Sequence, residues 1–161
     1  MSNKISWLLL ILSIVILAGC KKDASINGGA YMARTSIDSL NLTIKLLEGV
    51  EYKGGDETSA LFCEEAQTRY SRSFSIRPTE SIPEDIVDWK LVALDNEGAF
   101  YYRTERKEAV GSGGPEEHLI GYVVINGHYF KVTSGAMLHS PSPDSTWCIP
   151  MIQTLRYEGG R

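Results

Sequence analysis

Apolar and polar residues alternate along residues 37–47. Side chains of a β-strand point in turn to its two faces, so this alternation predicts a strand with one buried face. We expect a single strand over the whole range, with these apolar residues facing a core: Leu40, Leu42, Ile44 and Leu46.

A different spacing follows the Gly54-Gly55 break. Apolar residues recur here three and four positions apart, at Phe62, Cys63, Ala66 and Tyr70. This period is typical of one face of a helix, and Asp56 is a residue type that caps helix N-termini. The pattern predicts a helix over residues 56–70, with Cys63 pointing inward.

Two hairpins are predicted in the second half of the chain. Residues 89–95 and 99–105 flank Asn96-Glu97-Gly98, a three-residue loop whose glycine can take the left-handed position. Residues 118–125 and 128–134 flank Asn126-Gly127, a strong hairpin signal.

The Asn-Gly turn also sets the register, and hence which side chains share a face. We expect one face to form the core, with Leu119, Val123, Ile125, Phe130 and Val132. The opposite face carries His118, Ile120, Tyr122, Val124, Tyr129, Lys131 and Thr133. This second face is either a solvated sheet surface or a contact surface.

The remaining elements are shorter. Residues 74–77 predict a brief strand, and Ser81-Ile82-Pro83-Glu84 is a capping-box pattern that opens a helical turn through Asp88. Residues 147–157 predict a last strand, which Pro150 places at an edge or a bulge. The expected fold class is α+β, mainly β: an antiparallel sheet or small sandwich, partly covered by the 56–70 helix.

The first twenty residues have the layout of a secretory signal. Lys4 precedes an apolar stretch over residues 7–17, and Leu17-Ala18-Gly19-Cys20 closes it. These four residues resemble the lipobox of bacterial lipoproteins, which implies that residues 1–19 are removed and that Cys20 carries the lipid. The alternative is an uncleaved anchor. A helix over residues 5–19 would reach only about 22 Å, short of a hydrocarbon core of about 30 Å.

This resemblance implies a cell-envelope location, held in a membrane by acyl chains. The residues after Cys20 are Lys21-Lys22-Asp23, which implies the outer membrane facing the periplasm, with cell-surface exposure as the alternative. We expect residues 20–33 to be the lipidated N-terminus and a flexible tether, and residues 34–161 to form a single β-rich globular domain.

The charge of the chain restricts the classes of molecule that it can bind. The chain of 161 residues has 16 basic and 20 acidic residues, a net charge of −4. Nucleic acid binding requires a clustered basic surface, so the acidic balance argues against it. A protein partner remains compatible with this charge.

Two cysteines remain once Cys20 is assigned to lipid. Outside the cytoplasm, Cys63 and Cys148 are most simply paired in a disulfide, which on the loop-entropy argument would stabilise the fold by about 4 kcal/mol. Two free buried thiols are the alternative.

Residues that could carry catalysis are present, but their arrangement argues against it. The predicted register puts His118 and His128 on different faces and at opposite ends of one hairpin, and His139 lies outside it, so we expect no metal site. Adjacent glutamates at Glu64-Glu65 and Glu116-Glu117 point in different directions. We therefore expect no catalytic residues, no cofactor and no enzymatic activity.

Tyrosine is enriched at protein interfaces, which makes Tyr101, Tyr102, Tyr122 and Tyr129 candidates for binding a partner. Cross-strand packing within the sheet is the alternative role.

A further resemblance concerns two short segments, Tyr129-Phe130-Lys131 after Asn126-Gly127 and Cys148-Ile149-Pro150. They are similar to segments of periplasmic lipoproteins that confer immunity to type VI secretion. This resemblance implies a membrane-anchored protein-binding module that acts as an immunity protein or inhibitor against a secreted toxin. The alternative is a structural or assembly lipoprotein of an envelope complex.

Overall fold

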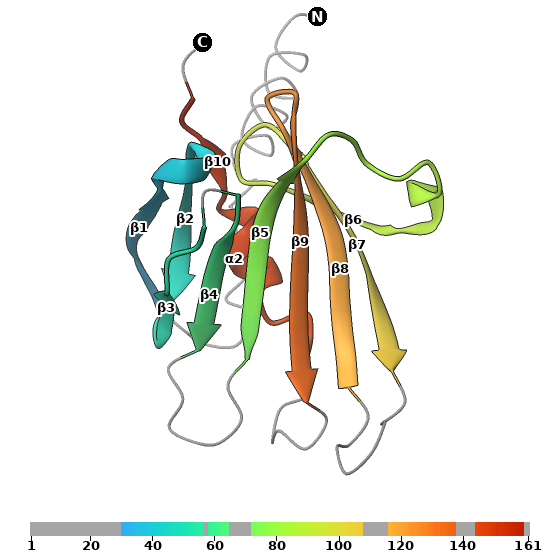
Figure 1. The fold of residues 1–161 in the computed structure, drawn as a ribbon, viewed down its shortest axis with the longest axis horizontal. Helices are drawn as coiled ribbons and strands as arrows, with labels where there is room; N and C mark the ends of the chain where they lie inside the picture. Colours follow the sequence, from blue (N-terminus) through green and yellow to red (C-terminus); the bar gives the residue numbers. More distant parts are fainter. Residues whose placement is uncertain (1–29, 57, 65–71, 108–115, 138–143, 160–161) are drawn as a thin grey trace, which may run out of the picture.

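The computed structural model describes residues 30–56, 58–64, 72–107, 116–137 and 144–159, and these form two antiparallel sheets (Figure 1). The large sheet has seven strands, in the order β3 (Val50–Tyr52), β4 (Ala60–Glu64), β5 (Ser73–Thr79), β9 (His128–Met137), β8 (Glu116–Ile125), β7 (Ala99–Lys107) and β6 (Lys90–Ala93). The small sheet has the order β1 (Tyr31–Ile37), β2 (Leu42–Leu47) and β10 (Arg156–Tyr157). The predicted class, α+β and mainly β, is confirmed.

Three short helical segments join these strands: η1 (Asp38–Leu40), η2 (Ile86–Asp88) and α2 (Ile149–Gln153). The small sheet and α2 lie against one face of the large sheet, and one apolar core joins all three (Figure 1). We call the covered face of the large sheet the inner face and the opposite one the outer face. Within the described residues, none of the helices has the length and apolar character that a membrane crossing requires.

Both predicted hairpins are present, but β6 ends at Ala93, so residues 94–98 connect β6 to β7 instead of the predicted Asn96-Glu97-Gly98 alone. In the β8–β9 hairpin, Ile125 lies opposite His128, and the turn residues Asn126 and Gly127 have φ values of 49° and 77°. This is the left-handed conformation that a two-residue hairpin turn requires. All five residues predicted for the core face are buried: Leu119, Val123, Ile125, Phe130 and Val132.

The predicted helix over residues 56–70 is wrong where the structure describes it. The segment forms β4, whose Phe62 lies opposite both Tyr52 and Phe74. The rings of Phe62 and Phe74 stack with their centroids 4.5 Å apart. Burial of these rings between neighbouring strands decides the conformation, because it outweighs the weak preference of a short segment for helix.

The predicted helix cap also has a different role. The Asp56 carboxylate accepts hydrogen bonds from the backbone N–H of Thr58, at 2.9 Å, and from the Ser59 hydroxyl, so it stabilises the turn before β4. The other two residues of the predicted helical face, Ala66 and Tyr70, lie outside the described residues.

The predicted strand over residues 147–157 is also wrong. The chain forms α2 there, and only Arg156–Tyr157 pair as β10. Pro150 stands in the first turn of α2, where its missing N–H costs nothing because that position has no helical acceptor. The segment thus buries Cys148, Met151, Ile152 and Leu155 in the core.

Near the start of the domain, the predicted elements differ from the structure in their boundaries. The strand predicted over residues 37–47 is divided between β1 and β2 by η1 and by Asn41, whose φ is 50°. The predicted alternation holds in β2, where Leu42, Ile44 and Leu46 are buried. β1 begins at Tyr31, within the range predicted as tether.

Cys63 and Cys148 are both free in the structure, so it does not contain the disulfide predicted from the sequence. Strand alternation supplies a reason. Phe62 on β4 faces the core, so Cys63 points to the outer face, whereas Cys148 is fully buried on the inner side.

These positions predict unequal thiol reactivity. Burial raises the pKa of the Cys148 thiol to about 12, so little reactive thiolate forms at pH 8. In a Cys20→Ala variant, a thiol reagent such as Ellman's is expected to label Cys63 in the folded protein and Cys148 only after denaturation. If neither thiol reacts until a reductant is added, the two cysteines are joined and this prediction is wrong.

Candidate functional site

A row of five residues crosses the outer face of the large sheet. Strand pairing places Leu91 opposite Tyr101, Tyr101 opposite Tyr122, and Tyr122 opposite Lys131. Arg77 on β5 lies opposite Lys131 and completes the row. Apolar and aromatic side chains therefore occupy one half of the row, and two basic side chains occupy the other.

Trp89, which directly precedes β6, adds a second aromatic layer to this face. Its ring centroid is 5.5 Å from that of Tyr122. The guanidinium carbon of Arg103 is 4.7 Å from the centre of the Trp89 ring. Arg103 is in turn paired with Glu105, at 2.7 Å, and with Asp85, at 3.7 Å. The Trp89 side chain is thus held between a tyrosine and an anchored guanidinium.

Exposed apolar residues border this cluster. Val87 on η2 and Leu91 on β6 retain 87% and 61% of their accessible surface. Leu91 lies opposite Tyr101, so its exposed apolar surface adjoins the aromatic residues, and exposed apolar patches are typical of sites that bind another protein. We call Val87, Trp89, Leu91, Tyr101 and Tyr122, with Arg77, Arg103 and Lys131, the outer aromatic face.

The four candidate tyrosines do not share one surface. Tyr101, Tyr122 and Tyr129 lie on the outer face, with Tyr129 opposite Val124 in the neighbouring row. Tyr102 points to the inner face, where its ring stacks on Phe100 with centroids 5.5 Å apart. Trp89 and Arg103 were not among the candidates from the sequence, because their contact depends on the β6–β7 register, in which Lys90 lies opposite Tyr102.

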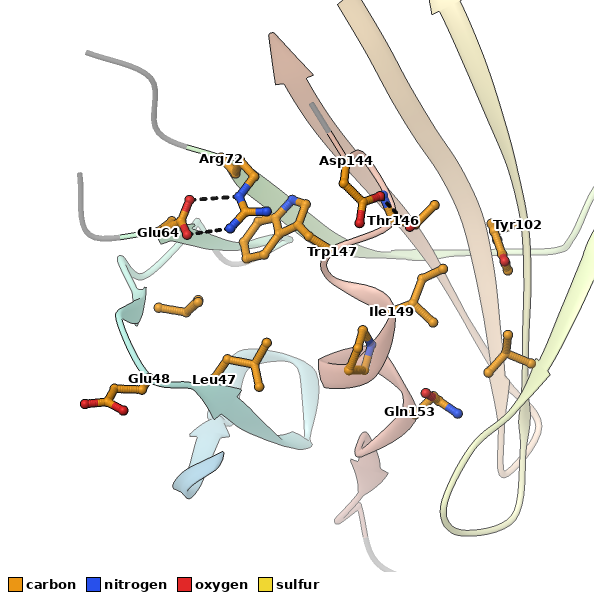
Figure 2. Close-up of a pocket in the computed structure, with 13 residues that line it drawn as sticks. Leu47, Glu48, Glu64, Arg72, Tyr102, Asp144, Thr146, Trp147, Ile149 and Gln153 are labelled. Atoms are coloured by element: carbon orange, nitrogen blue, oxygen red, sulfur yellow. Dashed lines mark hydrogen bonds and ion pairs between the residues drawn. The ribbon is translucent and has the colours of Figure 1, made fainter. Parts of the chain in front are cut away.

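A cavity of about 520 Å³ lies on the inner face, around α2 and the segment before it. Figure 2 shows that it extends from Leu47 and Glu48 on one side to Tyr102 on the other, past Trp147 and Ile149. Its walls are mostly apolar, and its carboxylates are Glu48, Glu64 and Asp144.

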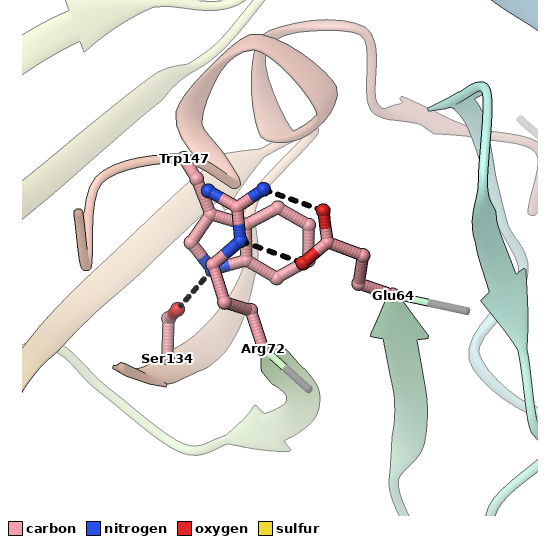
Figure 3. A network of polar contacts seen from close by, with 4 residues as sticks. All are labelled: Glu64, Arg72, Ser134 and Trp147. Carbon is pink, nitrogen blue, oxygen red and sulfur yellow. Dashed lines mark hydrogen bonds and ion pairs between the residues drawn. The ribbon is translucent and has the colours of Figure 1, made fainter. Parts of the chain in front are cut away.

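Arg72 and Glu64 form the main charged contact of the cavity (Figure 3). Two guanidinium nitrogens of Arg72 donate to the two Glu64 oxygens, at 2.5 and 2.8 Å. The guanidinium also lies over the Trp147 ring, 4.9 Å from its centre, and the Trp147 indole N–H donates to the Ser134 hydroxyl at 3.1 Å. These contacts join the ends of β4 and β5 to the C-terminal segment.

Glu64 and Asp144, the two carboxylates near Trp147, both form contacts within the fold. The hydrogen bonds from Arg72 lower the pKa of Glu64, and those to Glu64 raise the pKa of Arg72. Asp144 accepts from the backbone N–H of Thr146 at 2.8 Å, and from its hydroxyl. We interpret this network as a structural contact rather than as an acid/base pair.

The ion pair predicts a pH-dependent contribution to stability. The pKa of Glu64 is below its ordinary value of 4.5 in the folded state, so the contribution is complete above that value and is lost as the pH falls through the folded-state pKa. Because Glu64 is partly exposed, Glu64→Gln is expected to cost at most about 1 kcal/mol at pH 7.

Chemical denaturation at pH 7 and at pH 3 measures this effect. The difference between wild type and Glu64→Gln should shrink at the lower pH, and Glu80→Gln, at an exposed position, serves as the control. A difference that is the same at both pH values would contradict the assigned role of the pair.

The histidines lie where the hairpin register predicted. His118, near one end of the β8–β9 ladder, contacts the Glu116 carboxylate at 2.9 Å. His128, at the other end, stacks on Tyr157 with ring centroids 4.1 Å apart. The predicted separation of these two residues is confirmed, while His139 lies outside the described residues.

The structure is thus a mainly-β domain with an aromatic outer face and an inner-face cavity that contains the Glu64–Arg72 ion pair. A family model matches residues 54–156, more than half of the chain. The chain belongs to that family, Tsi3, the type six secretion immunity 3 domain. A comparison with curated proteins gives no match.

Proposed function

We propose that this chain is a type VI secretion immunity protein that neutralises a toxin by binding it, without chemistry of its own. Family membership supports the immunity role and implies a toxin as the protein partner. The observation that carries binding is the outer aromatic face, which combines tryptophan, tyrosine and arginine, the residue types that dominate binding energy at protein interfaces.

The same face suggests how the toxin is held. Trp89 and Tyr122 contact each other as aromatic anchors, and Arg103 already pairs with Glu105 and Asp85 in the free protein. Preorganised side chains lose little conformational entropy on binding, which favours tight association. We place Tyr101 and Tyr122 within the contact and Tyr129 at its edge, whereas Tyr102, on the inner face, lies outside it.

Protection of living cells tests the immunity role. A strain that lacks this gene is expected to be killed by sibling cells with an active type VI secretion system, and the wild-type gene should restore survival. The effector that kills the deletion strain should, once purified, bind the purified chain in a one-to-one complex. Equal survival with and without the gene, together with no binding, would reject the immunity role in favour of an assembly function.

We further propose that the protein acts as a lipoprotein, with its lipid on Cys20 and its location at the outer membrane facing the periplasm. The support is the lipobox-like Leu17-Ala18-Gly19-Cys20 after an apolar stretch. Two acyl chains suffice for stable anchoring, because each buried methylene contributes about 0.8 kcal/mol.

Fractionation tests the anchor. Wild-type protein is expected in the membrane fraction, and Cys20→Ala should lose that attachment. Cys63→Ala is the matched control and should stay with the membranes. If Cys20→Ala also remains fully bound to membranes, the lipid anchor at this residue is excluded.

A further inference from the structure

The basic end of the outer aromatic face has an unusual charge arrangement. Arg77 and Lys131 lie directly opposite each other on β5 and β9, and both point to the outer face. Like charges at directly opposed positions of neighbouring strands destabilise a sheet. The fold therefore bears an electrostatic cost at this position.

No carboxylate in the described part of the chain neutralises either cation, and neither Arg77 nor Lys131 forms an ion pair there. The contrast is Arg103 on the same face, which two carboxylates neutralise. The Lys131 ammonium lies 5.9 Å from the centre of the Tyr122 ring, so it adjoins the aromatic part of the face.

The positive charge of Arg77 and Lys131 is opposite in sign to the net charge of the whole chain. The protein has a net charge of −4, so two adjacent unpaired cations form a local positive surface on an acidic molecule. Charged groups across a protein interface are arranged to be complementary, and this complementarity determines specificity and the rate of encounter. A pair of cations beside exposed aromatic residues fits a partner with carboxylates next to apolar side chains.

We propose that Arg77 and Lys131 bind a carboxylate cluster on the toxin, while Leu91, Tyr101 and Tyr122 receive the apolar residues beside that cluster. This inference rests on the proposed function and specifies the chemistry of the partner. On binding, the carboxylates relieve the repulsion between the two cations, so the unfavourable arrangement in the free protein becomes favourable in the complex.

Charge reversal at Lys131 separates binding from folding. Lys131→Glu places opposite charges on the two strands, so the free protein is expected to melt about 1–4 °C higher. Affinity for the purified effector, measured by calorimetry with the full mature chain, should fall at least tenfold. Lys45→Glu makes the same charge change on an exposed residue of the small sheet and should leave affinity within twofold.

Two further measurements complete the test: the salt dependence of affinity, and binding to partners other than the effector. Wild-type affinity should decrease as sodium chloride is raised, and Lys131→Glu should show a weaker dependence. The proposal is overturned if Lys131→Glu and Arg77→Glu bind the effector as Lys45→Glu does. It is also overturned if the reversals instead abolish binding to phosphatidylglycerol vesicles or self-association in solution. A wild-type chain that binds no effector would reject the proposed function itself, and this inference with it.

Discussion

Replacing Trp89 with alanine is expected to weaken toxin binding about 30-fold or more, while the domain stays folded. Trp89 lies at the centre of the outer aromatic face, between the Tyr122 ring and the Arg103 guanidinium. Truncation of a central aromatic anchor typically costs at least about 2 kcal/mol of binding free energy. The residue is not part of the buried core, so its loss should have little effect on unfolding.

Calorimetric titration of the purified effector measures this effect, with thermal unfolding as the check on folding. Tyr102→Leu is the matched control, because it removes an aromatic ring from the inner face. It should leave affinity nearly unchanged. If Tyr102→Leu weakens binding and Trp89→Ala does not, the toxin contacts the side of the domain that holds the cavity.

The second large effect concerns the core. Phe74→Ala is expected to lower the free energy of unfolding by about 3–5 kcal/mol, the usual cost of removing a buried phenylalanine ring. Phe74 is only 1% exposed; its ring stacks on Phe62 and meets the edge of Trp147 with centroids 5.5 Å apart. Its removal therefore loosens both the large sheet and the C-terminal segment.

Urea denaturation of purified protein measures the loss. Leu61→Ala, on the neighbouring strand but 41% exposed, should change the free energy of unfolding by only about 0.5 kcal/mol. Losses of similar size at the two positions would mean that the Phe62–Phe74–Trp147 stack is not the centre of the core.

Sequence reasoning succeeded where the determining interactions are local. The Asn126-Gly127 turn fixes the β8–β9 register through its own backbone conformation, so it also predicts which side chains of the hairpin are buried. It failed over residues 56–70, because the strand conformation of β4 depends on pairing with β3 and β5, which no local pattern reveals. Pro150 was misjudged for the same reason: a proline suits a strand edge and a helix start equally well.

The candidate site was predicted in part. The hairpin register placed Tyr122 and Tyr129 on one face, and the structure adds Tyr101 by direct pairing with Tyr122. The sequence could not separate Tyr101 from Tyr102 without the strand register of β7. The cavity could not be foreseen, since its lining comes from six separate places in the chain, between Leu47 and Gln153.

The start of β1 has a consequence for how the domain meets a membrane. The Ala30 carbonyl accepts from the Glu48 N–H at 3.0 Å, and the Tyr31 hydroxyl contacts the Pro150 carbonyl, so the chain enters the domain at the rim of the cavity. Tyr157, beside the other end of β2, stacks on His128, so the Asn126-Gly127 turn lies at the far end.

With Cys20 lipidated as proposed, about ten residues join the lipid to Ala30, and such a linker spans at most about 35 Å. The end of the domain that holds the cavity would then be the membrane-proximal one. The outer aromatic face would be parallel to the bilayer normal. A toxin crossing the envelope would then meet the outer aromatic face from the side and close to the membrane surface.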